Sequence, residues 1–431
     1  MIKNKIVKNA GWIIGCKIVQ SVLALIVSML TARFLGPSGF GVINYAASVV
    51  AFAVPIMQLG VNAVLVQEIV TDPKREGEAI GSAVTMCFTS SLLCILGVVA
   101  FASIVNAGER ETIIVCGLYS LILIAQAFEM IQYWFQAKYL SKYTSVIMLI
   151  AYALVTAYKI FLLISKKSVY WFAISYAIDY SIIAIGLFIV YKKLGTQKLR
   201  FSFDMAKHLF SKGKYYIVSS MMVTIFAQTD KVMLKLMMGD EFVGYYSAAV
   251  TCAGMTSFVF TAIIDSMRPM IFESKKTDNS AFEKNVSRLY CLIIYLSLAQ
   301  SVVMTLFAPL IVNILYGVEY QSSIGTLQIL VWYTTFSYMG AVRDIWILGE
   351  NKQRYLWILN LGGATVNIAL NFALIPIMGV NGAALASLIT QAFTNIVMNV
   401  IVWPLRHNNK LVLQGLNPML VLKLLNRGKK K

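Results

Sequence analysis

The sequence predicts an all-α polytopic membrane protein of about 12 transmembrane helices, in two six-helix lobes related by pseudo-two-fold symmetry. Of its 431 residues, 59% are apolar and only 13% are charged, and the mean hydropathy is +0.74. Soluble domains carry roughly 25% charged residues, so a soluble globular protein is excluded. Runs of about 20 mainly apolar residues, the length that crosses a bilayer as a helix, recur along the whole chain. An internal repeat divides these runs into two halves.

Twelve such runs follow one another, of which the ninth is interrupted by Pro309. The first six extend over Gly11 to Leu35, Gly41 to Val66, Ile80 to Val105, Thr112 to Ala137, Thr144 to Ser165 and Tyr170 to Tyr191. The second six extend over Tyr215 to Met238, Val243 to Met267, Tyr290 to Val312, Ile324 to Leu348, Tyr355 to Met378 and Asn381 to Trp403. The longest connection, Lys192 to Lys214, is too short for a folded catalytic domain. We therefore expect the function to reside in the helix bundle.

The distribution of basic residues predicts the orientation in the membrane. The chain has 37 Lys and Arg against 19 Asp and Glu, a formal net charge of +18. Most of the basic residues fall in segments that are cytoplasmic if both termini are inside, whereas the outer connections hold only Arg33, Arg110, Lys166 and Lys167. The positive-inside rule then places both termini in the cytoplasm. Lys3, Lys5 and Lys8 precede the first run as they would a secretory signal, but its length favours a retained span.

The repeat is carried by glycines that follow the first and the seventh run. The segment from Phe34 reads FLGPSGFGVINYAA, and the segment from Met237 reads MMGDEFVGYYSAAV. A shift of 203 residues places Gly36 on Gly239 and Gly41 on Gly244. Two halves of the same topology, related by an axis along the membrane normal, account for this match. We predict lobes over residues 1–195 and 215–405, a cytoplasmic linker over 196–214 and a basic tail over 406–431.

Polar residues form stripes at helical spacing on several predicted spans. The equivalent first and seventh spans carry equivalent stripes, which are Lys17, Ser21, Ala24 and Ser28 in one and Ser220, Thr224, Ala227, Gln228, Lys231 and Lys235 in the other. Further stripes comprise Asn44, Ser48, Gln58 and Asn62 beside Pro55, then Asn360, Asn367 and Asn371, and then Ser387, Gln391, Asn395 and Asn399. Hydrogen bonds between helices explain any single stripe. Their number favours a water-filled interior.

Charged residues inside the spans are few and balanced. Five are basic (Lys17, Lys159, Lys231, Lys235 and Arg343), and five are acidic (Glu129, Asp179, Asp230, Asp265 and Asp344). Lipid-facing charges are costly, so each must face a cavity, form a pair or extend to the interface. Extension to the interface is an alternative for Lys17, Lys235, Lys159 and Asp265, which lie near span ends. A local ion pair is the alternative for Arg343 and Asp344.

Other chemistries have little support in the sequence. The six cysteines lie in or beside spans without a CxxC pair, so they are expected to be small buried residues. His208 and His407 lie in polar connections, which excludes an HExxH site or a His-centred triad. No Walker-type loop is present. The basic tract Lys429 to Lys431 follows the positive-inside pattern and indicates proximity to anionic lipid rather than nucleic acid. We expect neither an enzyme nor a metal site.

Several of these segments resemble a known family. They are Thr31 to Ala46 (TARFLGPSGFGVINYA), Tyr133 to Ala137 (YWFQA), Thr229 to Leu234 (TDKVML), Gly244 to Ala249 (GYYSAA) and Gly379 to Ala386 (GVNGAALA). Their order resembles the polysaccharide-export flippases, the O-antigen and capsule repeat-unit translocases of the multidrug/oligosaccharidyl-lipid/polysaccharide exporter superfamily. The resemblance extends over nearly the whole chain and implies a MATE-like transporter fold in the bacterial cytoplasmic membrane.

The resemblance also implies a substrate and a mechanism. The substrate would be an undecaprenyl-diphosphate-linked oligosaccharide, moved from the inner to the outer leaflet by alternating access. A cation-lined cavity would hold the diphosphate, with Lys17, Lys231, Arg343, Lys235 and Arg33 as candidates. Sugar hydroxyls would contact the polar stripes, with Ser21, Ser28, Asn44, Gln58, Asn62, Thr224, Gln228, Asn367, Gln391 and Asn395 as candidates. The expected partners are the lipid-linked glycan, membrane lipid, and the glycan polymerase and glycosyltransferases of the same pathway.

No cofactor is expected, and a proton gradient, a sodium gradient or the membrane potential would supply the energy. Asp230, Glu129 and Asp179 are candidates for ion coupling, because a buried acid can bind a proton in one state and release it in another. One feature departs from the cation-lined cavity that the resemblance implies: the spans contain as many acidic as basic residues. The alternatives are an ion-coupled multidrug antiporter of the same superfamily and, less well supported, a membrane-embedded glycan polymerase or ligase. The short outer loops disfavour the latter.

Overall fold

The computed structural model describes the backbone of residues 2–195 and 197–417, and the side chains of these residues except 2–14, 17 and 18. The described residues form helices and turns without a β-strand, which confirms the predicted all-α fold class. They belong to two compact units, Met1–Val232 (unit 1) and Met233–Lys431 (unit 2). The boundary falls inside the long helix α9 (Phe203–Met238), so this helix contributes to both units. The predicted lobes, 1–195 and 215–405, were defined by the repeat and stay a prediction.

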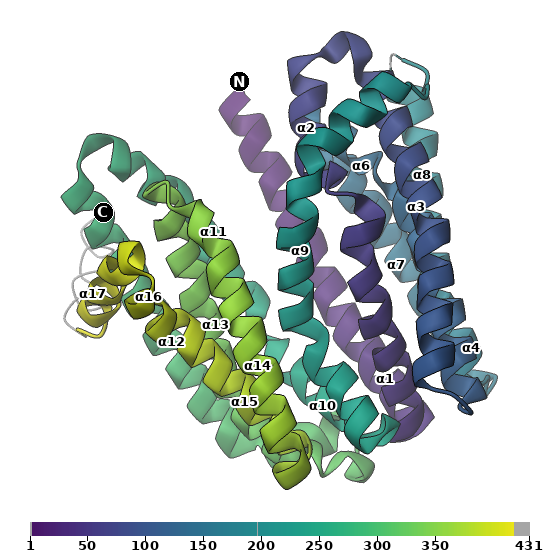
Figure 1. Ribbon diagram of the computed structural model, residues 1–431, viewed down its shortest axis with the longest axis vertical. Coiled ribbons are helices and arrows are strands. Elements are labelled where there is room, and N and C mark those ends of the chain that lie inside the picture. Colours follow the sequence, from purple (N-terminus) through teal and green to yellow (C-terminus); the bar gives the residue numbers. More distant parts are fainter. Residues whose placement is uncertain (1, 196, 418–431) are drawn as a thin grey trace. The chain divides into compact units, whose positions relative to one another are not determined.

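Unit 1 contains eight further α-helices and a 3₁₀ turn within its described residues. They are α1 (Ile2–Gln58), α2 (Val61–Thr71), η1 (Pro73–Arg75), α3 (Glu76–Val105), α4 (Arg110–Ser120), α5 (Ile122–Glu129), α6 (Gln132–Ala137), α7 (Ser141–Ile164) and α8 (Val169–Leu194). Helix α7 packs between α1 and α8, and α5 packs between α3 and α8, so these helices lie side by side (Figure 1).

Unit 2 begins at the end of α9 and continues to the last described residues. Its elements are α10 (Asp240–Gly254), α11 (Ser257–Thr277), α12 (Asn279–Leu315), η2 (Val318–Tyr320), α13 (Ser323–Gly349), η3 (Gln353–Tyr355), α14 (Leu356–Met378), α15 (Val380–Ala392), η4 (Phe393–Val397), α16 (Met398–Ile401), η5 (Trp403–Leu405) and α17 (Arg406–Gly415). All are α-helices or 3₁₀ turns except η4, which is a single π-helical turn.

Each of the twelve predicted spans coincides with a helix or a chain of short helices. Nine helical segments of the described chain are long and apolar enough to cross a membrane, or ten if α10 and α11, bent by 44°, form one span. The helical segment Val19–Thr71 is counted once although it covers the end of the first predicted span and all of the second. Helix α13, the tenth predicted span, is not one of these nine segments, because polar residues along its length lower its mean hydropathy.

The predicted repeat is visible in the backbone. Helix α1 is broken at Gly36, which has φ 67° and ψ 176°, and Pro37 follows it. The equivalent residue, Gly239, has φ 106° and ψ −179° and separates α9 from α10. Only glycine adopts this region of backbone space readily. The two residues that the 203-residue shift aligns therefore make the same turn, although the sequence around them differs.

The predicted linker 196–214 is ordered where it is described. Residues 203–214 form the first turns of α9, and residues 197–202 are bonded to the start of α3. The Gln197 side chain donates to the carbonyl oxygen of Pro73 at 2.9 Å and accepts from the amide of Gly77 at 3.0 Å. A Cβ at Gly81 would lie 2.4 Å from the carbonyl oxygen of Arg200, so this contact requires glycine. The connection is therefore fixed to unit 1.

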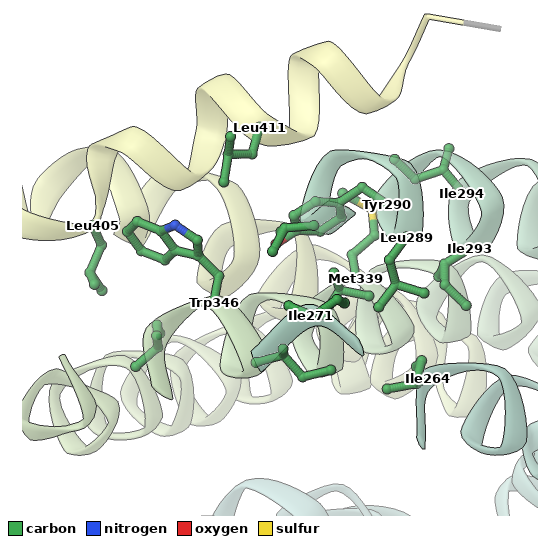
Figure 2. Packing of buried hydrophobic residues seen from close by; sticks show 14 of the residues in the cluster. Ile264, Ile271, Leu289, Tyr290, Ile293, Ile294, Met339, Trp346, Leu405 and Leu411 are labelled. Atoms are coloured by element: carbon green, nitrogen blue, oxygen red, sulfur yellow. The ribbon is translucent and has the colours of Figure 1, made fainter. Parts of the chain in front are cut away.

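The core of unit 2 is formed by α11, α12, α13 and α17. Trp346, Tyr290, Phe282 and Leu411 are all at most 1% exposed and belong to one hydrophobic cluster. Figure 2 shows α17 lying across this cluster, with Leu411 directed toward Tyr290 and Trp346. Buried aromatic side chains of this size contribute about 3–5 kcal/mol each when compared with alanine. The short helix α17 is thus an integral part of unit 2.

Candidate functional site

A cleft between the second half of α1 and the middle of α9 lies within unit 1 and has a volume of about 400 Å³. We call it the neutral cleft because none of its lining residues is charged. The lining residues are Ala51, Val54, Pro55 and Gln58 from α1, and Ser220, Val223, Thr224, Ala227 and Gln228 from α9. The structure thus brings together three predicted sugar ligands, Gln58, Thr224 and Gln228, from positions far apart in the sequence.

The two helices of the neutral cleft meet at both of its ends. At one end, the Ser48 hydroxyl lies 2.9 Å from Oε1 of Gln228. At the other end, Gly60 approaches the backbone of Gly213 so closely that a Cβ on Gly60 would lie 2.0 Å from the Gly213 carbonyl oxygen. Gly60 also has φ 66°, which disfavours any other residue. Between these contacts, Pro55 lacks the N–H that would bond the Ala51 carbonyl, so the helix is locally weakened where the cleft opens.

Polar groups of the neutral cleft keep unused hydrogen-bonding capacity. Nδ2 of Asn62 donates to Oε1 of Gln58 at 2.8 Å, and the Thr224 hydroxyl donates to the Ser220 carbonyl at 3.0 Å. Within the described part of the chain, no hydrogen bond employs the amide nitrogens of Gln58 or Gln228. Each of these NH₂ groups can donate two hydrogen bonds. The arrangement suits a ligand with many hydroxyl groups.

The same polar face continues along both helices beyond the cleft. Asn44, another predicted sugar ligand, donates to the Phe40 carbonyl at 2.9 Å and lies one turn from Ser48. On α9, Lys231 follows Gln228 by three residues and stands beside the buried Asp230. Lys235 is buried and pairs with Asp240, so its ammonium group already has a counter-ion in unit 2.

A second polar cluster in unit 1 combines two candidate coupling acids with a lysine. We call Glu129, Lys159 and Asp179 the acid–lysine cluster. Glu129 is 9% exposed and Lys159 is 7% exposed. The carboxylates of Glu129 and Asp179 interact electrostatically with each other. The Lys159 ammonium lies 3.7 Å from the centre of the Tyr176 ring and in electrostatic range of Asp179. Lys159 therefore faces the interior of unit 1 and does not extend to the interface, which was the alternative raised by its position near a span end.

The acids of this cluster lack the close partners that would fix their charge. Within the residues that the structure describes, no cationic nitrogen comes within 4.0 Å of the Glu129 or Asp179 carboxylate. Oδ1 of Asp179 is buried without a hydrogen-bond partner in the described structure. A buried acid without a close cation is expensive to ionise, so this cluster can take up a small cation or a proton.

Arg343 is buried in unit 2 and contacts the π-helical turn. Its Nε and Nη2 donate to Oδ1 of Asp344 at 3.1 and 2.9 Å, and its Nη1 donates to the Thr394 carbonyl at 3.2 Å. The predicted local pair with Asp344 is therefore present. A π-helical turn leaves backbone carbonyls displaced from their usual partners, and the guanidinium group satisfies one of them.

The predicted sugar ligands of unit 2 are buried, since Gln391 is 8%, Asn395 4% and Asn367 1% exposed. Asn399, which belongs to the same polar stripe as Gln391 and Asn395, is 0% exposed. Nδ2 of Asn395 donates to Oε1 of Gln391 at 2.8 Å, and Nδ2 of Asn399 donates to the Asn395 carbonyl at 2.6 Å. We call Gln391, Asn395 and Asn399 the amide ladder. On α14, Nδ2 of Asn371 donates to Oδ1 of Asn367 at 3.1 Å.

The other candidates lie on the first half of α1. Ser21 and Arg33 are exposed, and Ser28 is half-buried. The side chain of Lys17 lies outside the described residues. The structure brings none of Ser21, Ser28 and Arg33 into the lining of the neutral cleft.

The cysteines and histidines have structural surroundings. All six cysteines are buried, as predicted, and within the described residues none of them forms a disulfide. His208 pairs with Glu68 at 3.1 Å and His407 with Glu283 at 3.0 Å. In the part of the chain that the structure describes, no three His, Cys, Asp or Glu side chains are grouped so that they could hold a metal ion.

Sequence reasoning missed two features of these sites. It did not connect Tyr176 with Lys159, although Tyr176 and Asp179 are three residues apart and therefore share a face of α8. It also did not anticipate the contact of Gly60 with Gly213, because Gly60 lies in a predicted span and Gly213 in a predicted connection, and no sequence pattern links the two glycines. The three-residue spacing of Tyr176 and Asp179 could have been read from the sequence, whereas no sequence pattern indicates the contact between the two glycines.

The fold is that of the MATE-type transporters. A MATE family transporter of the MOP superfamily in an inward-facing conformation superposes with a TM-score of 0.68 and 13% identity, covering 90% of this chain and 96% of that one. The lipid II flippase MurJ in an inward closed conformation also gives a TM-score of 0.68 and 13% identity, covering 95% of this chain and 92% of that one. These similarities confirm the predicted fold of a polytopic transporter.

The chain belongs to the polysaccharide biosynthesis protein family, whose model matches residues 6–275. It is 23% identical over 403 residues to a putative O-antigen transporter of Shigella flexneri, covering 88% of this chain and 94% of that protein. It is 22% identical over 206 residues to a probable low-salt glycan biosynthesis flippase of Haloferax volcanii, covering 48% of this chain and 44% of that protein. An uncharacterized membrane protein of Methanocaldococcus jannaschii is 27% identical over 263 residues, 58% of this chain and half of its own length. The family predicted from the sequence is confirmed.

Proposed function

We propose that this protein is a flippase that moves undecaprenyl-diphosphate-linked oligosaccharide repeat units from the inner to the outer leaflet of the bacterial cytoplasmic membrane. The movement occurs by alternating access, with both termini in the cytoplasm, and supplies O-antigen, capsule or exopolysaccharide assembly. The glycan polymerase and glycosyltransferases of the same pathway are its functional partners. Membership of the polysaccharide biosynthesis family and the long alignment with a putative O-antigen transporter support this proposal.

The observation that carries the proposal is the chemistry of the neutral cleft. Its polar lining consists of amides and hydroxyls, Gln58, Ser220, Thr224 and Gln228, and includes no carboxylate. Sugar hydroxyls both donate and accept hydrogen bonds, and neutral amides match them without the desolvation of a charge. A multidrug antiporter for organic cations would be better served by acidic or aromatic lining residues. The neutral cleft therefore favours a glycan over a cationic drug.

In this proposal, Lys231, which continues the polar face of α9 beyond the neutral cleft, holds the diphosphate. Lys231 lies one helical turn beyond Gln228 on α9, and Lys17 is a second candidate on α1. Lys235 and Arg343 already pair with Asp240 and Asp344, so in this conformation they are less suited to a new anion. An ammonium group in a low-dielectric cleft attracts a multiply charged diphosphate strongly.

The acid–lysine cluster is our candidate for ion coupling. Glu129 and Asp179 are held close enough to interact, and no cation within 4.0 Å in the described structure neutralises either of them. Binding of a proton or a sodium ion would remove this electrostatic cost, so the occupied and empty clusters would favour different conformations. Asp230, the third candidate, is buried on α9.

The proposal is tested in a strain that lacks this gene and accumulates lipid-linked repeat units on the cytoplasmic side. The wild-type gene should restore surface glycan and remove the accumulated intermediate. Lys231→Ala should restore neither, at normal protein abundance, because the diphosphate loses its cation. The matched control is Lys276→Ala, an exposed lysine at the end of α11, which should restore export fully. Full export by Lys231→Ala would refute its role, and failure of the wild-type gene would refute the proposed function.

A further inference from the structure

The outer face of α17 combines basic and large apolar side chains in a single stripe. Its opposite face is fixed to unit 2, because Asn408 and Leu411 are fully buried and Gly415 is packed against Tyr290. Asn408 accepts a hydrogen bond from the Tyr290 hydroxyl at 2.9 Å. This attachment determines which residues of α17 point away from the protein.

The residues that point away are those suited to a membrane surface. Trp403 is 72% and Leu413 is 67% exposed, and Arg406 and Lys410 are also exposed. These four residues follow at intervals of three or four along one side of the helix and the turn before it. Aromatic and basic residues on one exposed face of a short helix are typical of helices that lie in the headgroup region of a bilayer.

Arg406 and Trp403 form a preorganised pair. The guanidinium carbon lies 4.1 Å from the centre of the indole ring, and Nε donates to the Val400 carbonyl at 2.6 Å. Among the described residues, the two terminal nitrogens of this guanidinium group donate to no hydrogen-bond acceptor. They can therefore donate to a phosphate in the two-pronged geometry that arginine favours.

A second exposed tryptophan lies near the start of α14, in a helix that packs against the segment before α17. Gly362 of α14, five residues after Trp357 in the sequence, lies against Met398 of α16, five residues before Trp403. Trp357 is 53% exposed, and the neighbouring Arg354 stacks over a tyrosine ring at 4.9 Å. Two exposed tryptophans with adjacent arginines define the level of a membrane interface.

The charge of this region has one sign. Among the described residues after Glu350 there is no Asp or Glu, and the basic ones are Lys352, Arg354, Arg406 and Lys410. The carboxylate that contacts α17 from another helix in the described structure is Glu283, which is engaged by His407 on a different side of α17. A surface of this charge repels cationic partners and attracts anionic ones.

We propose that the outer face of α17 is a binding site for anionic phospholipids, in which Arg406 and Lys410 contact the phosphates while Trp403 and Leu413 enter the interface. This site is separate from the neutral cleft and does not depend on which substrate is transported. A second protein is the less favoured occupant, because the exposed apolar residues alternate with cations instead of forming a continuous patch.

A fluorescent label at position 413 tests the site in the full-length protein. The six native cysteines are buried, so Leu413→Cys can be labelled selectively with a polarity-sensitive dye. The labelled protein is placed in lipid nanodiscs of phosphatidylcholine with increasing phosphatidylglycerol. The emission should shift to the blue as phosphatidylglycerol is added. Arg406→Gln with Lys410→Gln should raise the phosphatidylglycerol fraction needed for half of the shift by about 10-fold or more, since each surface cation contributes about 1 kcal/mol.

Two controls distinguish a specific lipid-binding site on α17 from a general attraction of the cationic protein to anionic lipid. Lys166→Gln with Lys167→Gln removes two exposed cations from the turn between α7 and α8 and should leave the response unchanged. Arg406→Lys keeps the charge but loses the two-pronged geometry, so its response should lie between those of the wild type and the Arg406/Lys410 variant. The proposal is overturned if the dye responds equally to both lipids, if the Arg406/Lys410 variant keeps the preference, or if the Lys166/Lys167 variant loses it. A blue shift in detergent that grows with protein concentration would assign the face to a second copy instead.

Discussion

The neutral cleft of unit 1 and the amide ladder of unit 2 contain the same kinds of side chain in different environments. Gln58 and Gln228 line an open volume of about 400 Å³ and keep unused donors in the described structure. Gln391 and Asn395 are at most 8% exposed and bond to each other. A polar side chain that is buried and bonded contributes to stability, whereas one that faces an open volume is available to a ligand. Residue type alone therefore does not identify a substrate-binding position.

The largest effect is expected where the geometry of the neutral cleft is fixed. Gly60→Ala should lower the free energy of unfolding by about 3 kcal/mol, because a left-handed φ costs about 1–2 kcal/mol and an overpacked contact about 1–3 kcal/mol. Thermal unfolding in detergent measures this change. Gly97→Ala is the matched control, because a Cβ at Gly97 meets nothing within 4 Å, and it should be neutral or stabilising. Equal stability of the two variants would show that the Gly60–Gly213 contact does not hold the helices.

The next prediction separates the cleft from the ladder directly. Gln391→Ala should lower the free energy of unfolding by about 2 kcal/mol, because it removes a buried hydrogen bond and leaves a partner unsatisfied. Gln58→Ala should change it by less than about 1 kcal/mol and reduce glycan export instead. Thermal unfolding and export are measured on both variants. If both glutamines affect stability alike, the distinction between the two regions fails.

A third variant extends the comparison to the acid–lysine cluster. Asp179→Asn should leave folding intact, because the amide has the same shape as the carboxylate and breaks no hydrogen bond of the buried Oδ1. Export should no longer respond to an imposed proton or sodium gradient. Asp265→Asn is the control, since Asp265 is 54% exposed and pairs with Arg268 at 3.1 Å. An unaltered gradient response in Asp179→Asn would remove this cluster from the coupling mechanism.

The smallest effect is expected at the edge of the neutral cleft. Ser48→Ala removes the hydroxyl that lies 2.9 Å from Gln228 and should cost about 0.5–1.5 kcal/mol of stability, the range for a single hydrogen bond. Ser91→Ala is the control, because the Ser91 hydroxyl bonds only within its own helix, to the Phe88 carbonyl. If Ser48→Ala reduces glycan export while the free energy of unfolding stays within this range, Ser48 positions the Gln228 side chain. If export is unchanged, it does not.

Much of the fold was predictable because it depends on local patterns. Apolar runs of about 20 residues predict spans, and the aligned glycines predict the equivalent turns at Gly36 and Gly239. The ordered segment 197–202 and the π-helical turn at Phe393–Val397 were not predictable. Both depend on contacts between residues that are more than fifty positions apart, such as Gly77 with Gln197 and Arg343 with Thr394.

The candidate site was predictable in part for the same reason. The stripe with Gln58 and the stripe with Thr224 and Gln228 were visible as helical periodicity, but their meeting in one cleft depends on Gly60 and Gly213. The stripe with Gln391 and Asn395 looks identical in the sequence and is buried in the structure. Periodicity identifies a polar face, and only packing decides whether this face contacts a ligand or another helix.

The most direct test of the central claim is a translocation assay with purified protein in proteoliposomes. Lipid-linked oligosaccharide is placed in the inner leaflet, and its appearance outside is followed with an impermeant reagent that reacts with the glycan. The wild-type protein should expose the glycan, Gln58→Ala with Gln228→Ala should slow this by about 10-fold as two hydrogen-bonding groups are lost, and the exposed control Gln321→Ala should match the wild type. Movement of organic cations without glycan translocation, or wild-type rates in the Gln58/Gln228 variant, would contradict the account.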